Sequence, residues 1–272
     1  PDIDLESLAE GRHPMQQRLV FEELLAHTLS LRQLRSRMRK HQALALQSNG
    51  NLSKKFLHAL EFQLTRAQQR VINEIETDLH AAIPMQRLVQ GDVSSGKTIV
   101  ALMAVLHAVE SGYQAVVMAP TEILAEQHYA TFCSRFEQYP VNVACLSRFR
   151  PRRVQRAIID DLKTGKIDIV IGTHRLLQKD VAFNDLGLLV LDEEQRFGVK
   201  HKEKLKRLKS TVDVLALTAT PIPRTLHLSL VGVRDISIIS TPPEYRKSII
   251  TYISEFDDAL IAEAIRKELR RQ

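Results

Sequence analysis

The sequence predicts an α/β fold, in which a parallel β-sheet carries helices on both faces and follows a helical N-terminal segment. Short apolar runs rich in Val, Ile and Leu recur after residue 57, as strands buried on both faces of a sheet require. Helical patterns lie between several of these runs, which is typical of βαβ units and a parallel sheet. Before residue 57 helical periodicity dominates and no strand pattern occurs.

Residues 1–55 are expected to form a helical lead-in or linker. Helical periodicity extends from Met15 to Gln47, and Ser48–Asn51 break it. The segment is expected to pack against the following domain or to bridge to a domain outside this chain. Its apolar positions at helical spacing are Leu24, Leu25, Leu31, Leu34 and Met38.

Residues 56–245 are expected to form one domain, and residues 246–272 a segment leading out of it. The helices expected within the domain are 97–110, 122–136 and 151–164, and a further helical pattern covers 257–271. The expected strands are 87–90, 115–119, 141–146, 167–171, 188–191 and 214–217, with β-like stretches at 236–239 and 249–253.

Composition narrows the class of protein. The net charge of +6 and the pI of about 9.4 favour a polyanionic partner, and three basic runs occur near residues 32–40, 148–156 and 200–209. Each run by itself is equally compatible with a solvated helix face. Cys133 and Cys145 are too few for a disulfide framework, which fits a reducing cytoplasm. No apolar run is long enough for a membrane helix, so no membrane partner is expected. The start at Pro1, without Met or a signal pattern, indicates a piece of a longer protein.

A glycine-rich motif follows the apolar pair Leu88-Val89. Its glycines allow tight turns that bring backbone N–H groups onto phosphate oxygens, and the helix after it adds its positive end. Lys97 is the expected catalytic residue that reaches the β- and γ-phosphates of ATP, and Thr98 the expected Mg²⁺ ligand. The strand–loop–helix context disfavours an accidental match. The expected ATP-binding residues of the motif are Gly91, Asp92, Val93, Ser94, Ser95, Gly96, Lys97 and Thr98.

Acidic residues follow the apolar run Leu188–Leu191. Ligands bind at the carboxyl edge of open parallel sheets, where such acids and the glycine-rich motif would meet. Asp192 is expected to hold Mg²⁺ and Glu193 to orient and deprotonate the attacking water, both as catalytic residues. Alone, acids at a strand end are ordinary loop residues, and the upstream motif makes the functional interpretation strong.

Together these motifs resemble superfamily 2 helicases. Gly91–Thr98 is similar to motif I and Asp192–Gln195 to motif II, while Thr218-Ala219-Thr220 resembles motif III. The resemblance implies a RecA-like first motor domain that binds ATP and Mg²⁺. It also implies adenine-side roles for Phe62 and Gln68, which lie in a segment similar to the Q-motif, and adds Gln195 to the cofactor-binding residues.

Two bacterial families compete within that superfamily. The N-terminal half, to about residue 132, resembles RecG in the segments Gly11–Pro14 and Gln90–Val93. The C-terminal half, from about Ser134, resembles the transcription-repair coupling translocases called Mfd in the segments Gly165–Ile169 and Asp192–Gly198. An engineered chimera and a homologue between the two families both remain open. Either resemblance implies ATP-driven translocation on double-stranded or branched DNA in repair or recombination. A second RecA-like motor domain is the implied partner, with RNA polymerase as a further partner if the chain is Mfd-like.

The resemblance, and the basic run that follows the strand expected at 141–146, suggest residues that contact nucleic acid. These are Thr121, Thr173, His174, Arg148 and Arg150. Ordinary roles stay open for them, because Thr121 suits a helix N-cap and His174 a polar loop position. Without its partner domain the fragment is expected to hydrolyse ATP weakly or not at all. The alternative function is an engineered or non-catalytic interaction fragment that retains the ATP motifs.

Overall fold

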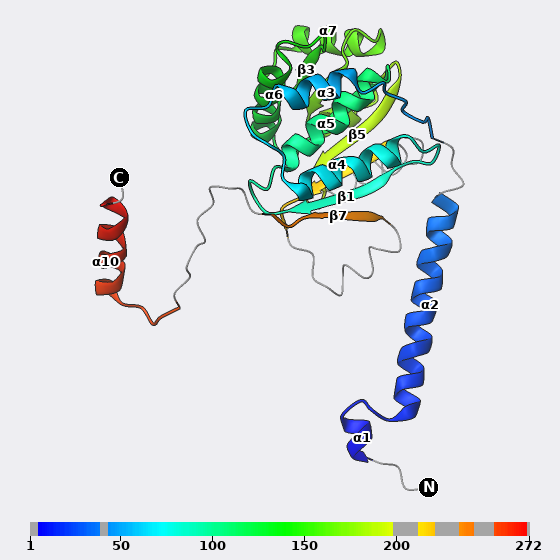
Figure 1. The fold of residues 1–272 in the computed structure, drawn as a ribbon, viewed down its shortest axis with the longest axis vertical. Helices are drawn as coiled ribbons and strands as arrows, with labels where there is room; N and C mark the ends of the chain where they lie inside the picture. The colour runs from blue at the N-terminus through cyan, green and yellow to red at the C-terminus, as the bar shows by residue number, and fades with distance from the viewer. Residues whose placement is uncertain (1–4, 39–42, 198–211, 221–233, 242–252, 271–272) are drawn as a thin grey trace. The chain divides into compact units, whose positions relative to one another are not determined.

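The computed structural model describes residues 5–38, 43–197, 212–220, 234–241 and 253–270 (Figure 1). The chain separates into two compact units, Pro1–Pro242 and Pro243–Gln272, which are described individually here. Three sequence expectations lie wholly or mainly outside the described residues: the β-like stretch 249–253, the basic run 200–209 and the stretch 221–225 shared by RecG and Mfd.

A seven-stranded, wholly parallel sheet forms the centre of the first unit, in the order β3-β4-β2-β5-β6-β1-β7. All six expected strands are present, and the stretch 236–239 becomes the edge strand β7, so the prediction of a parallel α/β sheet is confirmed. The bounds are β1 Gln86–Gly91, β2 Gln114–Met118, β3 Val143–Leu146, β4 Ile169–Gly172, β5 Leu186–Asp192, β6 Asp213–Thr218 and β7 Asp235–Ile239.

Helices cover both faces of the sheet, and two hydrophobic clusters show this directly. Neighbouring strand residues enter different clusters: Val117 joins the one with helices α3 to α6, and Val116 joins the one with α7. Because side chains alternate along a strand, each buried strand needs apolar residues at every position. The helices are α3 Asn51–His58, α4 Arg66–Leu79, α5 Lys97–Glu110, α6 Glu122–Phe136 and α7 Arg152–Lys163, with short 3-10 turns at His174–Leu177 and Glu194–Arg196.

The N-terminal helices are α1 (Leu5–Ala9) and α2 (Pro14–Met38). The expected helix to Gln47 was wrong at its C-terminal end, because residues 43–49 are not helical. Leu46 is fully buried there, its N–H donates to the Leu79 carbonyl (2.8 Å), and its carbonyl contacts Nε2 of His107 (2.9 Å). Tertiary partners therefore take the backbone groups that a longer helix would have used.

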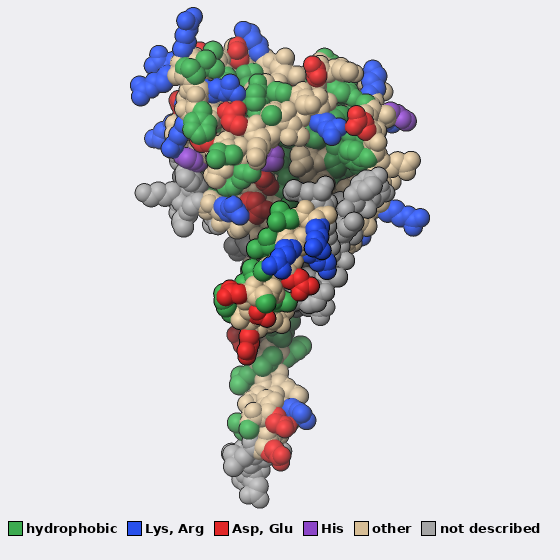
Figure 2. All heavy atoms as spheres, turned by 90° about the vertical axis from the view of Figure 1, so that its left-hand side faces the viewer, with side chains coloured by type: hydrophobic (Ala, Val, Ile, Leu, Met, Phe, Trp, Pro, Cys, Tyr) green, Lys and Arg blue, Asp and Glu red, His purple; other side chains and the backbone are tan. Residues whose placement is uncertain are grey.

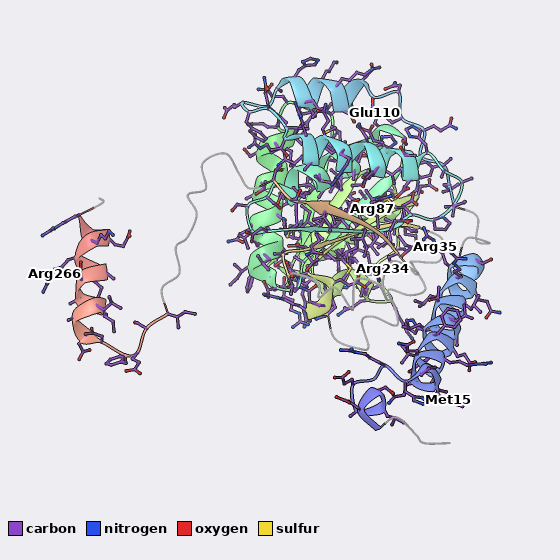
Figure 3. All side chains as sticks on the ribbon, turned by 60° about the horizontal axis from the view of Figure 1, so that its bottom comes forward. Met15, Arg35, Arg87, Glu110, Arg234 and Arg266 are labelled. Atoms are coloured by element: carbon purple, nitrogen blue, oxygen red, sulfur yellow. The ribbon has the colours of Figure 1, made fainter. Side chains whose placement is uncertain are left out.

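Apolar side chains of α2 stay exposed within the described residues. Met15 and Arg35 lie near opposite ends of this helix (Figure 3), and Arg35 contacts Asp235 at 2.5 Å. Because the exposed side chains suit burial against another surface, we retain the proposal that the segment bridges to a further domain. The exposed side chains are Met15, Leu19, Val20, Phe21, Leu24, Leu25 and Leu29.

Helix α3 spans the expected boundary at residue 55 and belongs to the core. Phe56 is buried, and its ring centroid lies 5.6 Å from that of Phe136 and 5.9 Å from that of Tyr139.

In the second unit, the pattern expected over 257–271 forms α10 (Asp258–Leu269), whose first turn is capped by the Asp257 carboxylate through the Ala259 N–H (2.8 Å).

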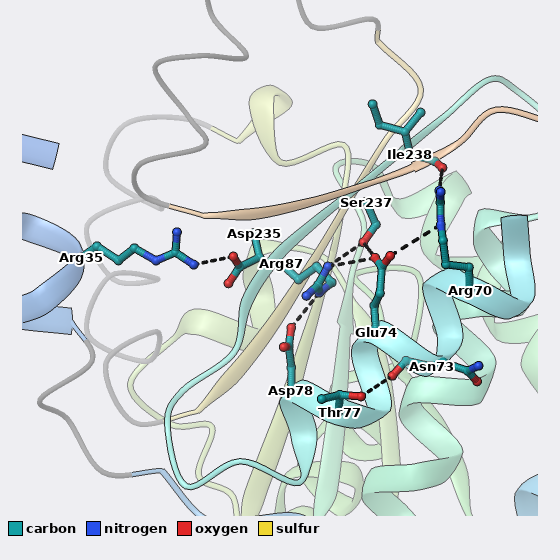
Figure 4. A network of polar contacts seen from close by, with 10 residues as sticks. All are labelled: Arg35, Arg70, Asn73, Glu74, Thr77, Asp78, Arg87, Asp235, Ser237 and Ile238. Atoms are coloured by element: carbon teal, nitrogen blue, oxygen red, sulfur yellow. Dashed lines mark hydrogen bonds and ion pairs between the residues drawn. The ribbon is translucent and has the colours of Figure 1, made fainter. Parts of the chain in front are cut away.

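A polar network joins α4 to the strands β1 and β7 (Figure 4). Arg87 is the hub: its guanidinium lies 2.7 Å from the Asp78 carboxylate, 3.1 Å from Glu74 and 2.7 Å from the Ser237 hydroxyl. Arg70 donates to the Ile238 carbonyl of β7 at 2.7 Å. The network fixes the β7 edge of the sheet to the helix that precedes β1.

Candidate functional site

The carboxyl ends of β1, β6 and β5 meet at one edge of the sheet. β6 lies between the other two, with Gln90 opposite Thr218 and Asp192 opposite Leu217. The glycine-rich motif leaves β1 and the acidic motif leaves β5, so the two groups lie two strands apart on the same edge. This is the arrangement that the sequence predicted, and ligands bind at this edge in open parallel sheets.

The glycine-rich motif forms a tight loop that ends at the start of α5. Ser94 and Gly96 both have positive φ, at 65° and 87°. The ammonium group of Lys97 donates to the carbonyls of Gly91 and Asp92, both at 2.8 Å. The Ser95 hydroxyl is buried and has no hydrogen-bond partner within the described residues. The loop therefore holds an unsatisfied donor and a cation beside a helix N-terminus, as anion binding requires.

Gln68 supports this loop from the start of α4. Its Oε1 accepts from the Thr65 N–H (2.9 Å) while the Thr65 hydroxyl accepts from its backbone N–H (3.2 Å), which is a capping box. Its Nε2 donates to the Ser95 carbonyl at 2.9 Å. A Cβ at Gly96 would lie 2.2 Å from that Nε2, so the position requires glycine. Phe62, which precedes the Thr65 cap of α4, is exposed.

Lys97 interacts electrostatically with Asp192 and Glu193 at the same edge of the sheet. Burial lowers the pKa of Lys97 below its ordinary value, while Glu193, Asp192 and Asp92 act in the opposite direction. The two acids at the end of β5 therefore act on the same cation as the glycine-rich loop. Thr98 is half-buried at the second position of α5.

Asp192 and Glu193 have different environments. Oδ2 of Asp192 lies 2.9 Å from Nε2 of His128 on α6, and both side chains are largely shielded from water. Glu193 has a left-handed backbone with φ 50°, which is uncommon for a residue with a side chain. Its carboxylate accepts from the Ala219 N–H (2.8 Å) and contacts Gln195. The turn therefore points the two carboxylates to different partners.

Gln195 links the acidic motif to the end of β6. Its Nε2 lies 3.3 Å from the Thr218 hydroxyl and 3.2 Å from the Thr220 hydroxyl. Next to it, Glu194 forms a two-bond ion pair with Arg234, at 2.6 and 3.0 Å. The segments at residues 192–195 and 218–220 are thus joined by side chains, and Arg234 holds the turn from the side of β7.

Most residues expected to contact nucleic acid gather around the first turn of α6. Thr121 caps this helix, accepting from the Leu124 N–H at 3.3 Å. The buried Thr173 donates to Glu122 (2.9 Å), and Arg148 contacts His174. All of these contacts are interactions within the protein. For Thr121, the contact with the Leu124 N–H is the helix N-cap that the sequence left open as its ordinary role.

Arg150 lies in the loop between β3 and α7, and its side chain contacts α6 one turn beyond Glu122. It pairs with Glu126 at 3.0 Å, and its guanidinium lies 5.4 Å from the centroid of the Tyr129 ring. On the face drawn in Figure 2, Lys and Arg side chains of the sheet unit are interspersed with acidic ones rather than forming one unbroken basic patch. On this face the cations are therefore separate side chains and not a broad positive surface.

A model of the DEAD/DEAH box helicase family matches residues 65–228, which is more than half of the chain. The chain belongs to the DEAD/DEAH box helicase family. The match begins at the Thr65 cap beside the glycine-rich loop and includes both the acidic motif and the segment 218–220. The helicase identity therefore covers every strand from β1 to β6.

The chain is similar in sequence to bacterial transcription-repair-coupling factors. The chain is 53% identical over 227 residues to that of Bacillus subtilis (strain 168), covering 84% of this chain and 19% of the relative. It is 52% identical over 216 residues to that of Staphylococcus epidermidis, covering 79% and 18%. The helicase chain thus spans less than a fifth of the length of these curated relatives.

Solved structures of helicases share the fold. A structure of RecG bound to a three-way DNA junction matches with a TM-score of 0.82 and 36% identity, over 94% of this chain and 34% of that one. The DEAD-box helicase Mss116 matches with a TM-score of 0.54 and 18% identity, over 68% of this chain and 42% of that one, which shows the RecA-like fold alone. The RecG and coupling-factor similarities each extend over most of the chain instead of dividing it into halves.

Some residues of this helicase site were missed by sequence reasoning. His128, Glu122 and Arg234 contact Asp192, Thr173 and Glu194 respectively. For His128 a signal existed, because it lies seven residues after Thr121 and therefore on the same face of the helix. For Glu122 and Arg234 no sequence signal existed, since their partners come from distant elements. The described residues include no helix long and apolar enough to cross a membrane.

Proposed function

We propose that this chain is the ATP-binding first motor domain of a longer DNA translocase, paired in the whole protein with a second RecA-like domain. The observation that carries the proposal is the meeting of Lys97, Asp192 and Glu193 at one sheet edge, where both acids act on the half-buried lysine. A triphosphate needs cations on its oxygens and carboxylates for its metal ion, and this edge offers both.

The residues present fit ATP and Mg²⁺. The unpartnered Ser95 hydroxyl and the N-terminus of α5 supply donors, and a side chain at Gly96 would collide with Gln68. Thr98 and Asp192 would hold Mg²⁺, which neutralises charge on the phosphate oxygens when bound. Phe62, Gln68 and Gln195 are assigned to the cofactor side of the site. The remaining cofactor-binding residues are Gly91, Asp92, Val93, Ser94, Ser95, Gly96, Lys97 and Thr98.

Each catalytic residue has a distinct task in this proposal. Lys97 leaves its loop carbonyls and donates to the β- and γ-phosphate oxygens, which places charge where it develops in phosphoryl transfer. Glu193 orients the attacking water and accepts its proton. Because Glu193 also accepts from Ala219, movement of the segment 218–220 would change the position of this base. Through this hydrogen bond, a change in the DNA-bound state of the protein would alter the position of the catalytic base at the ATP site.

Double-stranded or branched DNA is the proposed nucleic acid on which the whole protein translocates, in repair or recombination. The coupling-factor and RecG similarities support it, since the latter structure holds a three-way DNA junction. Thr121, Arg148 and His174 would contact phosphates near the first turn of α6, with Arg150 beside them and Thr173 anchoring the turn. A bacterial cytoplasmic location, and RNA polymerase as a partner of the whole protein, are part of the same proposal.

Titration of the 272-residue chain with a fluorescent ATP analogue and Mg²⁺ tests the nucleotide site. Binding that is lost in Lys97→Ala and retained in the exposed control Lys54→Ala supports the proposal. The whole protein should then hydrolyse ATP faster with duplex DNA, while the chain alone stays slow, because an arginine finger from a second domain contributes about 10³–10⁵ in rate. A chain that folds but binds no nucleotide would favour the alternative, a non-catalytic interaction fragment.

A further inference from the structure

Asp192 receives a contact from a histidine that lies outside the glycine-rich and acidic motifs. Nε2 of His128 lies 2.9 Å from Oδ2 of Asp192, and the two side chains are 17% and 16% exposed. A hydrogen bond to an ionised carboxylate that is largely shielded from water is stronger than an ordinary neutral one. With its proton on Nε2, His128 donates to one carboxylate oxygen and leaves the other oxygen of Asp192 available.

The helix that carries His128 is fixed at its first turn. The Glu122 carboxylate accepts from the Thr173 hydroxyl at 2.9 Å and from the Arg148 N–H at 3.1 Å. Phe132 and Phe136, further along α6, are buried in the core. Because α6 is held on both sides of residue 128, the imidazole reaches Asp192 from a rigid support rather than from a loop.

We propose that His128 is a positioning residue that orients the Asp192 carboxylate for the metal ion of the nucleotide site. The inference rests on the proposed function, since it assumes that Asp192 holds Mg²⁺. Residues behind a metal ligand fix its rotamer and direction, and their removal costs about 10–100-fold in metal affinity. His128 occupies that place behind Asp192, and its role extends the metal site from β5 to α6.

The test replaces His128 with Asn and with Gln, whose side-chain amides lie at different distances from the backbone. The Nδ2 of Asn lies near the place of the imidazole Nδ1, whereas the Nε2 of Gln lies near that of Nε2, the atom that contacts Asp192. Mn²⁺ replaces Mg²⁺, and its electron paramagnetic resonance signal reports the metal bound by the 272-residue chain with a non-hydrolysable ATP analogue. His128→Ala and His128→Asn should weaken Mn²⁺ binding about tenfold or more, and His128→Gln should keep most of it. Gln127→Ala, an exposed neighbour on α6, is the control that should behave as wild type.

The outcomes separate this inference from the function on which it rests. Unchanged Mn²⁺ affinity in His128→Ala or His128→Asn would overturn it, as would an equal loss in the Asn and Gln variants. If His128→Ala does not fold, the comparison of Asn with Gln carries the test by itself. A wild-type chain that binds no Mn²⁺ with nucleotide would overturn the proposed function and this inference together. Normal binding by the wild type with unaffected variants would overturn the role of His128 alone.

Discussion

Gln68 donates its side-chain amide to the carbonyl of Ser95 at 2.9 Å, which links the cap of α4 to the glycine-rich loop. The same amide accepts from Thr65, so its oxygen and its nitrogen are both used within the protein. The residue assigned to the adenine side of the site thus also supports the loop expected to bind the phosphates.

Replacing Gln68 with Ala should weaken nucleotide binding and lower stability. The Ser95 carbonyl would lose its partner, and an unsatisfied buried group costs about 1–3 kcal/mol. Thermal denaturation and titration with a fluorescent ATP analogue measure the two effects. Gln69→Ala is the matched control, because the Gln69 side chain is exposed on the same helix. Equal behaviour of the two variants would show that the Gln68–Ser95 bond is unimportant.

Gly96→Ala should abolish nucleotide binding, and Gly112→Ala should not. Both glycines have left-handed backbones, with φ 87° and 85°, so a side chain costs about 1–2 kcal/mol at either position. Only at Gly96 would the new Cβ also meet the Gln68 amide, at 2.2 Å, whereas at Gly112 no atom lies within 4 Å. Nucleotide titration of the two variants separates the collision from the backbone strain. Retained binding in Gly96→Ala would contradict the arrangement.

Asp213→Asn should stabilise the protein more at pH 8 than at pH 5. Burial raises the pKa of Asp213 to about 7, against the N–H donated by Met85. Because the folded pKa exceeds the ordinary value of 3.8, ionisation weakens the fold as pH rises from about 4 through 7. Each pKa unit corresponds to about 1.4 kcal/mol, and about two units lie between pH 5 and the folded pKa, so the difference between pH 8 and pH 5 should be about 3 kcal/mol. Asn keeps the acceptor for Met85 without the charge.

The measurement for Asp213 is the stability of variant minus wild type at each pH, from urea denaturation. Subtraction removes the contributions of other titrating groups, including His107, whose burial lowers its pKa and acts in the opposite sense on acidification. The exposed Asp185→Asn serves as the control. A difference that does not vary with pH would refute the prediction.

Arg87→Ala should cost about 3 kcal/mol of unfolding free energy. Its side chain is only 10% exposed and faces Glu74 and Asp78, which would be left half-buried without their cation. Arg18→Ala removes a pair whose side chains are 80% and 55% exposed and should cost less than about 1 kcal/mol. Urea denaturation measures both. Similar small losses would mean that the network around β7 contributes little.

Local sequence patterns are enough to predict a helix that begins beside its own glycine or capping residue. Helices α5 and α6 have the bounds expected from the sequence, because Lys97 follows a glycine that ends the loop and Thr121 caps the next helix. Local patterns were insufficient at residues 43–49. There Leu46 exchanges hydrogen bonds with Leu79 and His107, which are far away in sequence.

Residue types and short spacings are enough to predict the order of the strands along the chain, the loop around Lys97 and the carboxylates at the end of β5. Three-dimensional packing is what places β6 between β1 and β5, His128 against Asp192, and Arg234 against Glu194. The physical reason is that such contacts join elements tens of residues apart, and their energies depend on distances that a local pattern does not contain.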